Sequence, residues 1–289
     1  MKKLSRREFL GKSAIGFGSV LALSRFPLNL NEEMSSKTVK MPVGFQSWTV
    51  REMIAKDFPG TLKMMAGLGY QSIEMCSPPG YESLGFGSLI NMKGKEMKKI
   101  INDAGLKFMS THYGMDEFRN HLDERIEFAH ESGQKQMIVS MFPFPVKPTL
   151  SDWKKSADEL NTMGEKTKKA GIQMGYHNHH MEFAEIDGAL IYDSLMNQFD
   201  PEYVKMQFQV AVISIGFKAS TYFTKYPGRF ISAHLADWSA TEKKEAPIGQ
   251  GIVDWKEFFA TAKTGGVKNI FVEMGMDTFK PSAEYLKSL

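Results

Sequence analysis

The chain has 289 residues, of which 42% are hydrophobic and 24% charged, as in an ordinary globular protein rather than a disordered or fibrous one. Its single cysteine, Cys76, excludes an intramolecular disulfide and any multi-thiolate metal site, so a metal site must use histidine and carboxylate ligands. The net charge is +3, but the first thirty residues hold six basic side chains and one acidic one, which leaves residues 31–289 at −2. That balance argues against a nucleic-acid partner.

The N-terminal segment has the features of an export signal. Arg6 and Arg7 precede a Phe-Leu pair and then a short, Gly-rich, weakly apolar stretch over residues 14–23. The pattern resembles a twin-arginine signal, and the alternative is a disordered basic tail. The stretch is too short to span a membrane. We therefore expect residues 1–36 to be a signal and linker recognised by the twin-arginine export machinery. The exported, periplasmic protein would have no stable membrane anchor.

After Lys40, short β-prone runs alternate with longer amphipathic runs at a period near thirty residues. The pattern predicts eight strands, at 43–47, 72–76, 107–111, 136–141, 172–177, 205–209, 230–235 and 269–273. The helices predicted between them cover 54–68, 93–104, 118–132, 151–170, 189–198, 219–226 and 255–264, and a short helix follows Pro281.

Four predicted helices end at a glycine that suits a left-handed C-cap, namely Gly69, Gly105, Gly133 and Gly171. Eight strand–helix units predict a single closed (β/α)8 TIM barrel, an α/β fold, over residues 40–289. The alternative is an open, doubly wound sheet. It is disfavoured because no Gly-x-Gly-x-x-Gly turn follows the first strand.

Polar residues gather at the ends of the predicted strands, where the chemistry of such a barrel takes place. Five of the seven histidines lie at these ends, whereas His121 and His130 fall on a helix and are expected at the surface. His177, His234 and Glu273 end strands five, seven and eight, so they can converge at the barrel mouth. Burying them together without a cation would be costly. Taken alone, His112 is as readily a hydrogen-bonded core residue as a functional one.

Several short motifs follow one another in this part of the chain. They are Phe-Gln-Ser-Trp-Thr-Val-Arg from residue 45, Ile-Glu from 73, Thr-His from 111, Tyr-His-Asn-His from 176, Glu-Phe from 182, Tyr-Pro-Gly-Arg from 226, His-x-x-Asp from 234, Gly-Gln-Gly-Ile-Val-Asp-Trp from 249 and Val-Glu from 272. In this order and spacing they resemble the xylose isomerase-like TIM-barrel superfamily, specifically the sugar phosphate isomerase/epimerase group. The resemblance covers essentially everything after Lys40.

The resemblance implies one divalent metal ion, commonly manganese, cobalt, magnesium or zinc. Family members hold it with a Glu from strand five, an Asp from strand six, a His from strand seven and a Glu from strand eight. Carried over, the last two ligands are His234 and Glu273, while His177 replaces the Glu and Gln209 replaces the Asp. With Gln209 as an amide ligand, one carboxylate instead of three would balance the cation. The alternative is a barrel that has lost its metal.

The resemblance also implies proton transfer α to a ketone, which family epimerases perform with glutamates from strands five and eight. Only Glu273 remains of that pair, so His179 or Glu182 is expected as the second acid or base. Glu182 is equally a candidate loop anchor. The expected substrate-binding residues are Trp48, Glu74, His112 and Asp237.

Three functions follow from these residues. The first is a metal-dependent sugar isomerase or epimerase acting on a ketose or keto-sugar. The second is a lyase or hydratase that eliminates a group from a 3-keto-glycoside by the same enolate chemistry. The third is an exported sugar-binding barrel without catalysis. Gln209 favours the second and third, whereas His234 with Glu273 opposes the third. Export favours a neutral carbohydrate over a sugar phosphate as the small-molecule partner, and no motif indicates an oligomeric state.

Overall fold

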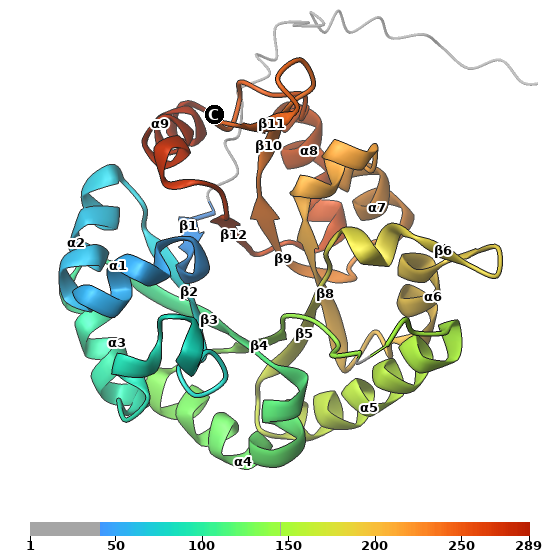
Figure 1. Cartoon of the computed structure of the whole chain (residues 1–289), viewed down its shortest axis with the longest axis horizontal. Coiled ribbons are helices and arrows are strands. Elements are labelled where there is room, and N and C mark those ends of the chain that lie inside the picture. The colour runs from blue at the N-terminus through green and yellow to red at the C-terminus, as the bar shows by residue number, and fades with distance from the viewer. Residues whose placement is uncertain (1–40, 145) are drawn as a thin grey trace, which may run out of the picture. The chain divides into compact units, whose positions relative to one another are not determined.

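Eight parallel strands close into a barrel in the order β1-β12-β9-β8-β5-β4-β3-β2 (Figure 1). The structure is a computed structural model that describes residues 41–144 and 146–289. The barrel strands are β1 (Val43–Gln46), β2 (Ser72–Cys76), β3 (Lys107–Tyr113), β4 (Gln136–Val139), β5 (Gln173–His177), β8 (Val204–Gln209), β9 (Phe230–Leu235) and β12 (Asn269–Val272). The predicted (β/α)8 TIM barrel is confirmed. The expected signal and linker, residues 1–36, lie outside the described residues.

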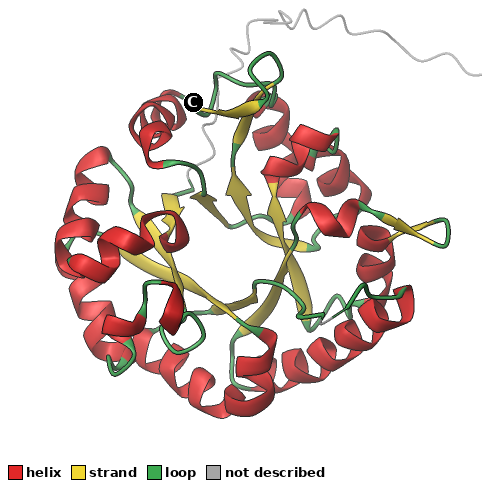
Figure 2. Cartoon of the chain, in the orientation of Figure 1, coloured by secondary structure: helices red, strands yellow, loops and turns green. Residues whose placement is uncertain are grey.

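Helices surround the barrel on the outside (Figure 2). They are α1 (Arg51–Lys56), α2 (Phe58–Leu68), α3 (Gly94–Asp103), α4 (Met115–Ser132), α5 (Leu150–Lys169), α6 (Ile191–Gln198), α7 (Ala219–Lys225), α8 (Trp255–Gly265) and α9 (Phe279–Ser288). The four predicted C-cap glycines all have positive φ, between 76° and 105°. No described helix has the length and apolarity that a membrane crossing requires.

Two predicted helices differ from the structure. The helix predicted over 54–68 is divided into α1 and α2, because Asp57 has an extended backbone and its carboxylate caps α2 by accepting from the Gly60 N–H at 2.9 Å. The helix predicted over 189–198 begins at Ile191, since β6 (Glu185–Ile186) and β7 (Ala189–Leu190) form a hairpin before it. A second hairpin, β10 (Asp237–Ser239) with β11 (Lys244–Ala246), follows β9.

Apolar side chains such as Leu62, Met97 and Trp153 are buried between the helices and the barrel. The barrel interior is different, because it contains a buried polar layer. Glu74, Ser110, Gln207 and Ser232 are all fully buried there and hydrogen-bonded to one another. A polar layer inside a barrel is stable only when its members satisfy each other. This layer lies beneath the histidines described next.

Candidate active site

Three histidines from three strands meet at the barrel mouth. His177 ends β5, and His112 and His234 lie one residue before the ends of β3 and β9. All three are buried, and one ring nitrogen of each lies within 4.8 Å of the other two. The His177 and His234 ring centroids are 4.3 Å apart, and His112 lies 5.0 Å from each. The structure therefore places His112 in a histidine cluster that could hold a metal ion.

His234 is held between two carboxylates. Its Nε2 lies 2.6 Å from Glu74 Oε1, and its Nδ1 lies 2.8 Å from Glu273 Oε2. Burial would lower the pKa of the imidazole, but Glu273 and Glu74 together raise it to about 9. Burial would likewise raise the pKa of Glu273, but His234 holds it at about 2. His112 and His234 keep the pKa of Glu74 well below its usual range.

Glu74 is part of the polar floor of the site. It accepts hydrogen bonds from Gln46 Nε2 at 2.8 Å and Gln207 Nε2 at 2.9 Å, and from the Ser110 hydroxyl. Gln207 Oε1 lies 2.6 Å from His112 Nε2. That hydrogen-bond pattern puts the proton of neutral His112 on Nε2 and leaves Nδ1 bare. Glu74 was expected to bind substrate; its partners instead orient it toward the histidines.

Gln209 contacts Glu273 rather than the histidines. Its Nε2 donates to Glu273 Oε2 at 2.6 Å, and its Oε1 accepts from the Ala211 N–H at 3.2 Å, which caps the 3-10 helix η5 (Val210–Ile215). With this orientation the amide nitrogen faces the site, so ligation through the oxygen would require the amide to turn. The side chain of Glu273 is 18% exposed, whereas that of Glu74 is fully buried. Glu273 is thus the carboxylate of this pair that a substrate can reach.

His177 has the environment of a metal ligand. It is buried, and neither of its ring nitrogens has a hydrogen-bond partner. Burial lowers its pKa well below the usual range, so the ring is neutral and keeps a lone pair. Among the described residues, no lysine or arginine hydrogen-bonds to Glu74 or Glu273. The neutral ring of His177, beside His234 and its two carboxylate partners, fits a site for a divalent cation.

His179 and Glu182 lie at the two ends of one turn after β5. His179 is the N-cap of the 3-10 helix η4 (His180–Phe183), and its ring centroid lies 4.7 Å from that of His177. Burial lowers the pKa of His179 to about 4, so it is neutral at pH 7. Glu182 is fully buried and accepts from the Tyr176 hydroxyl at 2.6 Å and the His179 N–H at 2.7 Å. These bonds make Glu182 a loop anchor, and burial raises its pKa to about 7.

Asp237 anchors a different loop. Its carboxylate accepts from Trp255 Nε1 at 2.9 Å and from four backbone N–H groups, those of Trp238, Gly249, Gly251 and Val253. A Cβ at Gly251 would lie 2.1 Å from Asp237 Oδ1, so only glycine allows this close approach. The carboxylate expected to bind substrate therefore holds residues 249–255 against the barrel.

Trp48 lies at the rim, in the 3-10 helix η1 (Ser47–Val50), and is partly buried. The guanidinium of Arg51 lies 4.2 Å from its ring centroid, and the Tyr81 ring approaches it edge-on at 6.1 Å. Gln46, Ser110 and Gln207 are site residues that the sequence analysis missed. The sequence did carry a signal for them. Residues two apart in a strand face the same side, so a polar residue two positions before a polar strand end, as Gln207 is before Gln209, should also face the site.

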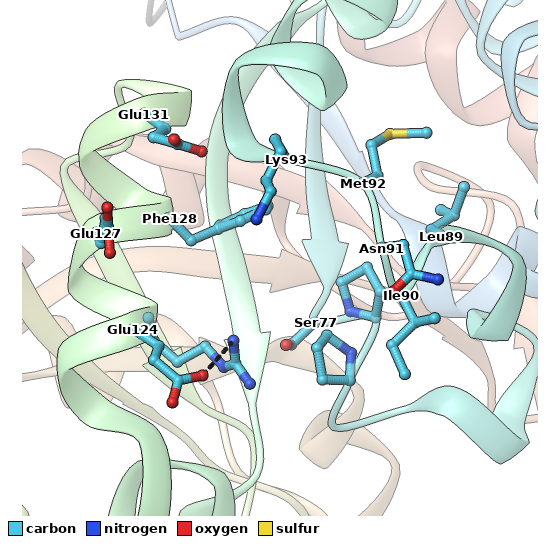
Figure 3. Close-up of a pocket in the computed structure, with 13 residues that line it drawn as sticks. Ser77, Leu89, Ile90, Asn91, Met92, Lys93, Glu124, Glu127, Phe128 and Glu131 are labelled. Carbon is cyan, nitrogen blue, oxygen red and sulfur yellow. Dashed lines mark ion pairs between the residues drawn. The ribbon is translucent and has the colours of Figure 1, made fainter.

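A separate pocket of about 300 Å³ lies beside α4, lined in part by Ser77, Met92, Glu124, Glu127 and Phe128 (Figure 3). None of the clustered histidines lines it. At least one of its polar groups is used within the fold: Glu131 Oε2 accepts from the Gly94 N–H at 2.9 Å and so ties α4 to the start of α3. We assign no ligand to this pocket.

Residues 62–289 match the family model described as "Xylose isomerase-like TIM barrel". The chain belongs to this family. An inosose dehydratase of Lacticaseibacillus casei is 25% identical over 249 residues, which cover 73% of this chain and 83% of that protein. The family resemblance seen in the sequence motifs is thus confirmed.

Two solved structures are also similar. A sugar phosphate isomerase/epimerase from Parabacteroides distasonis ATCC 8503 has a TM-score of 0.73 at 25% identity, covering 88% of this chain and 98% of that one. A xylose isomerase-like TIM-barrel protein from Mycobacterium smegmatis, in complex with magnesium, has a TM-score of 0.65 at 14% identity, covering 86% and 95%. The second similarity shows the fold alone. The dehydratase and the isomerase/epimerase support an enzymatic role for this chain.

Proposed function

We propose that the protein is a metal-dependent enzyme that removes the proton α to the carbonyl of a ketose or keto-sugar, as a sugar isomerase or epimerase. The observation that carries this proposal is the convergence of three buried histidines with Glu273, a carboxylate that remains open to the mouth. The similarity to an isomerase/epimerase and to a dehydratase supports the same class of chemistry, because both reactions can begin at a carbon next to a carbonyl.

The residues that would hold the cation are His177, His234 and Glu273, with His112 as the fourth donor. A divalent cation in this position supplies Lewis-acid polarisation of the substrate carbonyl and stabilises the charge that develops on its oxygen. Three of these four donors are imidazoles, which favour zinc or cobalt over magnesium, because magnesium prefers oxygen ligands.

Glu273 is the group that we assign as the base. Gln209 and His234 orient its carboxylate, and His234 keeps it ionised, so it carries no proton before the substrate binds. Glu74 is saturated in the floor of the site, and Glu182 is held in its loop. His179 is therefore the remaining acid or base beside the cluster, and its neutral ring can relay a proton between substrate oxygens.

A lyase is the second candidate, and one specific observation favours it. His177 stands on β5 where a two-base epimerase needs a carboxylate, so the site has one reachable carboxylate base. A β-elimination needs one base only. Glu273 takes the α-proton, the electron pair moves through the enolate to expel the β-substituent, and the departing oxygen receives the proton held by Glu273, relayed through His179 or water. The inosose dehydratase similarity supports this alternative.

Deuterium uptake tests the shared first step. The metal-loaded protein is incubated in D2O with ketopentoses, ketohexoses and 3-keto-glucosides, and products are followed by NMR and mass spectrometry. Solvent deuterium should enter the carbon α to the carbonyl, with an aldose or epimer as product for the first function and an unsaturated ketone for the second. Glu273→Gln should slow the uptake by about 10²–10⁴-fold. Absence of exchange across the whole panel would refute both functions.

We also propose that the twin-arginine machinery exports the folded protein, because Arg6 and Arg7 precede the Phe-Leu pair and the weakly apolar stretch. Replacing both arginines by lysine should retain the protein in the cytoplasm, whereas Lys2→Arg with Lys3→Arg, a control that changes no charge, should leave export unaltered. Cell fractionation measures the outcome. Normal export of the double-lysine variant would remove this assignment.

A further inference from the structure

A cavity of about 530 Å³ lies among the segments that follow β2, β3 and β4. The residues that line it include Gly80 and Tyr81 after β2, Gly114 after β3 and Ser140 after β4. We call this cavity the mouth pocket. Its volume lies within the range of small-molecule sites. Because the segments that follow the strands of a (β/α)8 barrel carry its substrate-binding residues, this position suits part of a substrate.

The inner side of the barrel connects the mouth pocket to the histidines. Gln136 on β4 faces the barrel axis, because its Oε1 accepts at 3.0 Å from Asn269 Nδ2 on β12, the strand opposite β4 in the closed order. Alternate residues of a strand share a face, so Ser140, whose N–H continues the ladder to β3, also faces the axis. In the same way Gly114, with an extended backbone, follows His112 on the inner face of β3, about 7 Å further along. The mouth pocket therefore lies one layer above His112, towards solvent.

Gly114 keeps this layer open. Apart from its chain neighbours, no atom lies within 4 Å of the position that a Cβ at residue 114 would take. The backbone there has a φ of −74°, which any residue can adopt. Neither the backbone nor close packing therefore requires glycine at this position. The space in front of Gly114 is open on the same face of β3 as His112, so a substrate bound at the histidines can extend into the mouth pocket.

The lining of the mouth pocket is part apolar and part polar. Met141 and Pro143, from the segment after β4, are both exposed. Asn120 and His121 are exposed polar residues of α4 that also line the pocket. A sugar ring combines apolar C–H faces with a rim of hydroxyl groups. It matches such a mixed surface better than an aromatic or alkyl group does.

The charges around the mouth pocket argue against an anionic ligand. Among the described residues that line it, Arg125 is the one lysine or arginine, and its Nε is paired with Glu117 Oε1 at 2.5 Å. The first turn of α4 carries Asp116 and Glu117, so carboxylates already lie at the end of the helix whose dipole would attract an anion. These carboxylates would repel a phosphate group, whereas uncharged hydroxyl groups face no such repulsion.

We propose that the mouth pocket binds a second, uncharged sugar ring, so that the substrate is a disaccharide in its keto form rather than a monosaccharide or a sugar phosphate. This inference rests on the proposed function. The reacting ring then lies at the histidines and Glu273, and the second ring occupies the space in front of Gly114. Tyr81 packs edge-on against Trp48 at 6.1 Å and donates to Ser140 Oγ at 2.7 Å, so it links the rim of the site to the pocket.

The test compares ring-locked sugars that have no carbonyl group and so are not turned over. Calorimetry on the full-length, zinc-loaded protein gives the Kd of trehalose, methyl cellobioside and methyl maltoside, and of methyl glucoside and its 6-phosphate. At least one of the three disaccharides should bind at least about tenfold more tightly than methyl glucoside, and more tightly than the 6-phosphate. A smaller preference, tightest binding of the 6-phosphate, or no measurable binding of any disaccharide at about 10 mM would overturn the proposal.

Two variants locate the second ring. Gly114→Leu should fill the open space in front of residue 114, and Asn120→Trp should narrow the pocket from α4. Each should reduce the disaccharide preference to less than about threefold and leave the methyl glucoside affinity within about twofold. A preference above that value in every folded pocket variant would overturn the proposal. Thermal melts verify that each variant folds, and either pocket variant suffices for the test.

Gly67→Leu is the matched control for Gly114→Leu. A Cβ at Gly67 would also meet no atom within 4 Å, but this residue lies on α2 and does not line the mouth pocket. The control should therefore retain the full disaccharide preference. Loss of the preference in Gly67→Leu as well would show that the effect does not come from the pocket and would overturn the assignment.

Two further outcomes separate this inference from the proposed function. If the disaccharide preference depends on the pocket but no 3-keto sugar exchanges deuterium, the pocket assignment stands and the proposed function fails. If 3-keto methyl glucoside and the 3-keto disaccharides exchange with equal kcat/KM, and the pocket variants change neither, the function stands and the pocket inference fails.

Discussion

Asp237 and Glu273 follow neighbouring strands of the barrel, β9 and β12, yet their carboxylates are satisfied in different ways. Asp237 accepts from four backbone N–H groups and one indole N–H. Glu273 accepts from the Gln209 amide and pairs with His234. The backbone N–H groups satisfy the Asp237 carboxylate fully, so this side chain serves to hold a loop. Glu273, beside imidazoles and partly exposed, can still exchange its partners for a cation, a proton or a substrate.

The largest expected effect comes from removing the charge of Glu273. Glu273→Gln should lower turnover by about 10²–10⁴-fold, because a positioned base contributes about that much, and it should also weaken divalent metal binding. Its near-isosteric side chain should leave the fold intact. Elemental analysis and deuterium exchange measure the two effects. Glu182→Gln is the matched control, and its metal content should remain normal. Equal losses in both variants would remove the distinction between base and anchor.

The converse prediction concerns Asp237. Asp237→Asn replaces one acceptor oxygen by a donor in a site of converging N–H groups, so it should lower the free energy of unfolding by about 2–4 kcal/mol. Metal affinity of the folded variant should be unchanged. Urea denaturation in the presence of a chelator, followed by metal titration, measures both quantities. Unchanged stability with lost metal binding would show that Asp237 belongs to the site.

A smaller effect is expected for Glu74, which acts through His112 and His234. Glu74→Gln should weaken divalent metal binding by about 10–100-fold, as is typical when a carboxylate partner of a ligating histidine is lost. Absorption spectra of the cobalt-substituted protein should shift, since the ring orientations change. Ser232→Ala is the control, because Ser232 bonds Gln207 and neither histidine. A native cobalt spectrum in Glu74→Gln would argue against the positioning role.

The smallest effect is a pH dependence of the metal-free protein. The pKa of His234 is raised to about 9 in the folded state, so its stabilising contribution is complete below its unfolded pKa of about 6.5 and is lost as pH rises through 9. The pKa of Glu273 is depressed to about 2, so its contribution persists until pH falls through that value. Denaturation in chelator should show stability falling between pH 6.5 and 9. His234→Gln should flatten that decline, and an unchanged slope in this variant would contradict the origin proposed for it.

The alternation of strands and helices in the sequence determined the barrel, and the barrel determines that strand ends meet at one mouth. That is why His177, His234 and Glu273 could be placed together from the sequence, and why the C-cap glycines could be identified. These features depend on local periodicity and on a topology that repeats.

The roles of individual polar residues were decided by tertiary structure. His234 and Glu74 are 160 residues apart in the chain, and Gln207 and Glu74 are 133 apart, yet both pairs are hydrogen-bonded. Asp237 became an anchor because a returning loop directs its N–H groups at the carboxylate. In the sequence, a carboxylate that anchors a loop looks the same as one that lies in the candidate site. Only the donors and neighbours brought to it by the folded chain fix what it does.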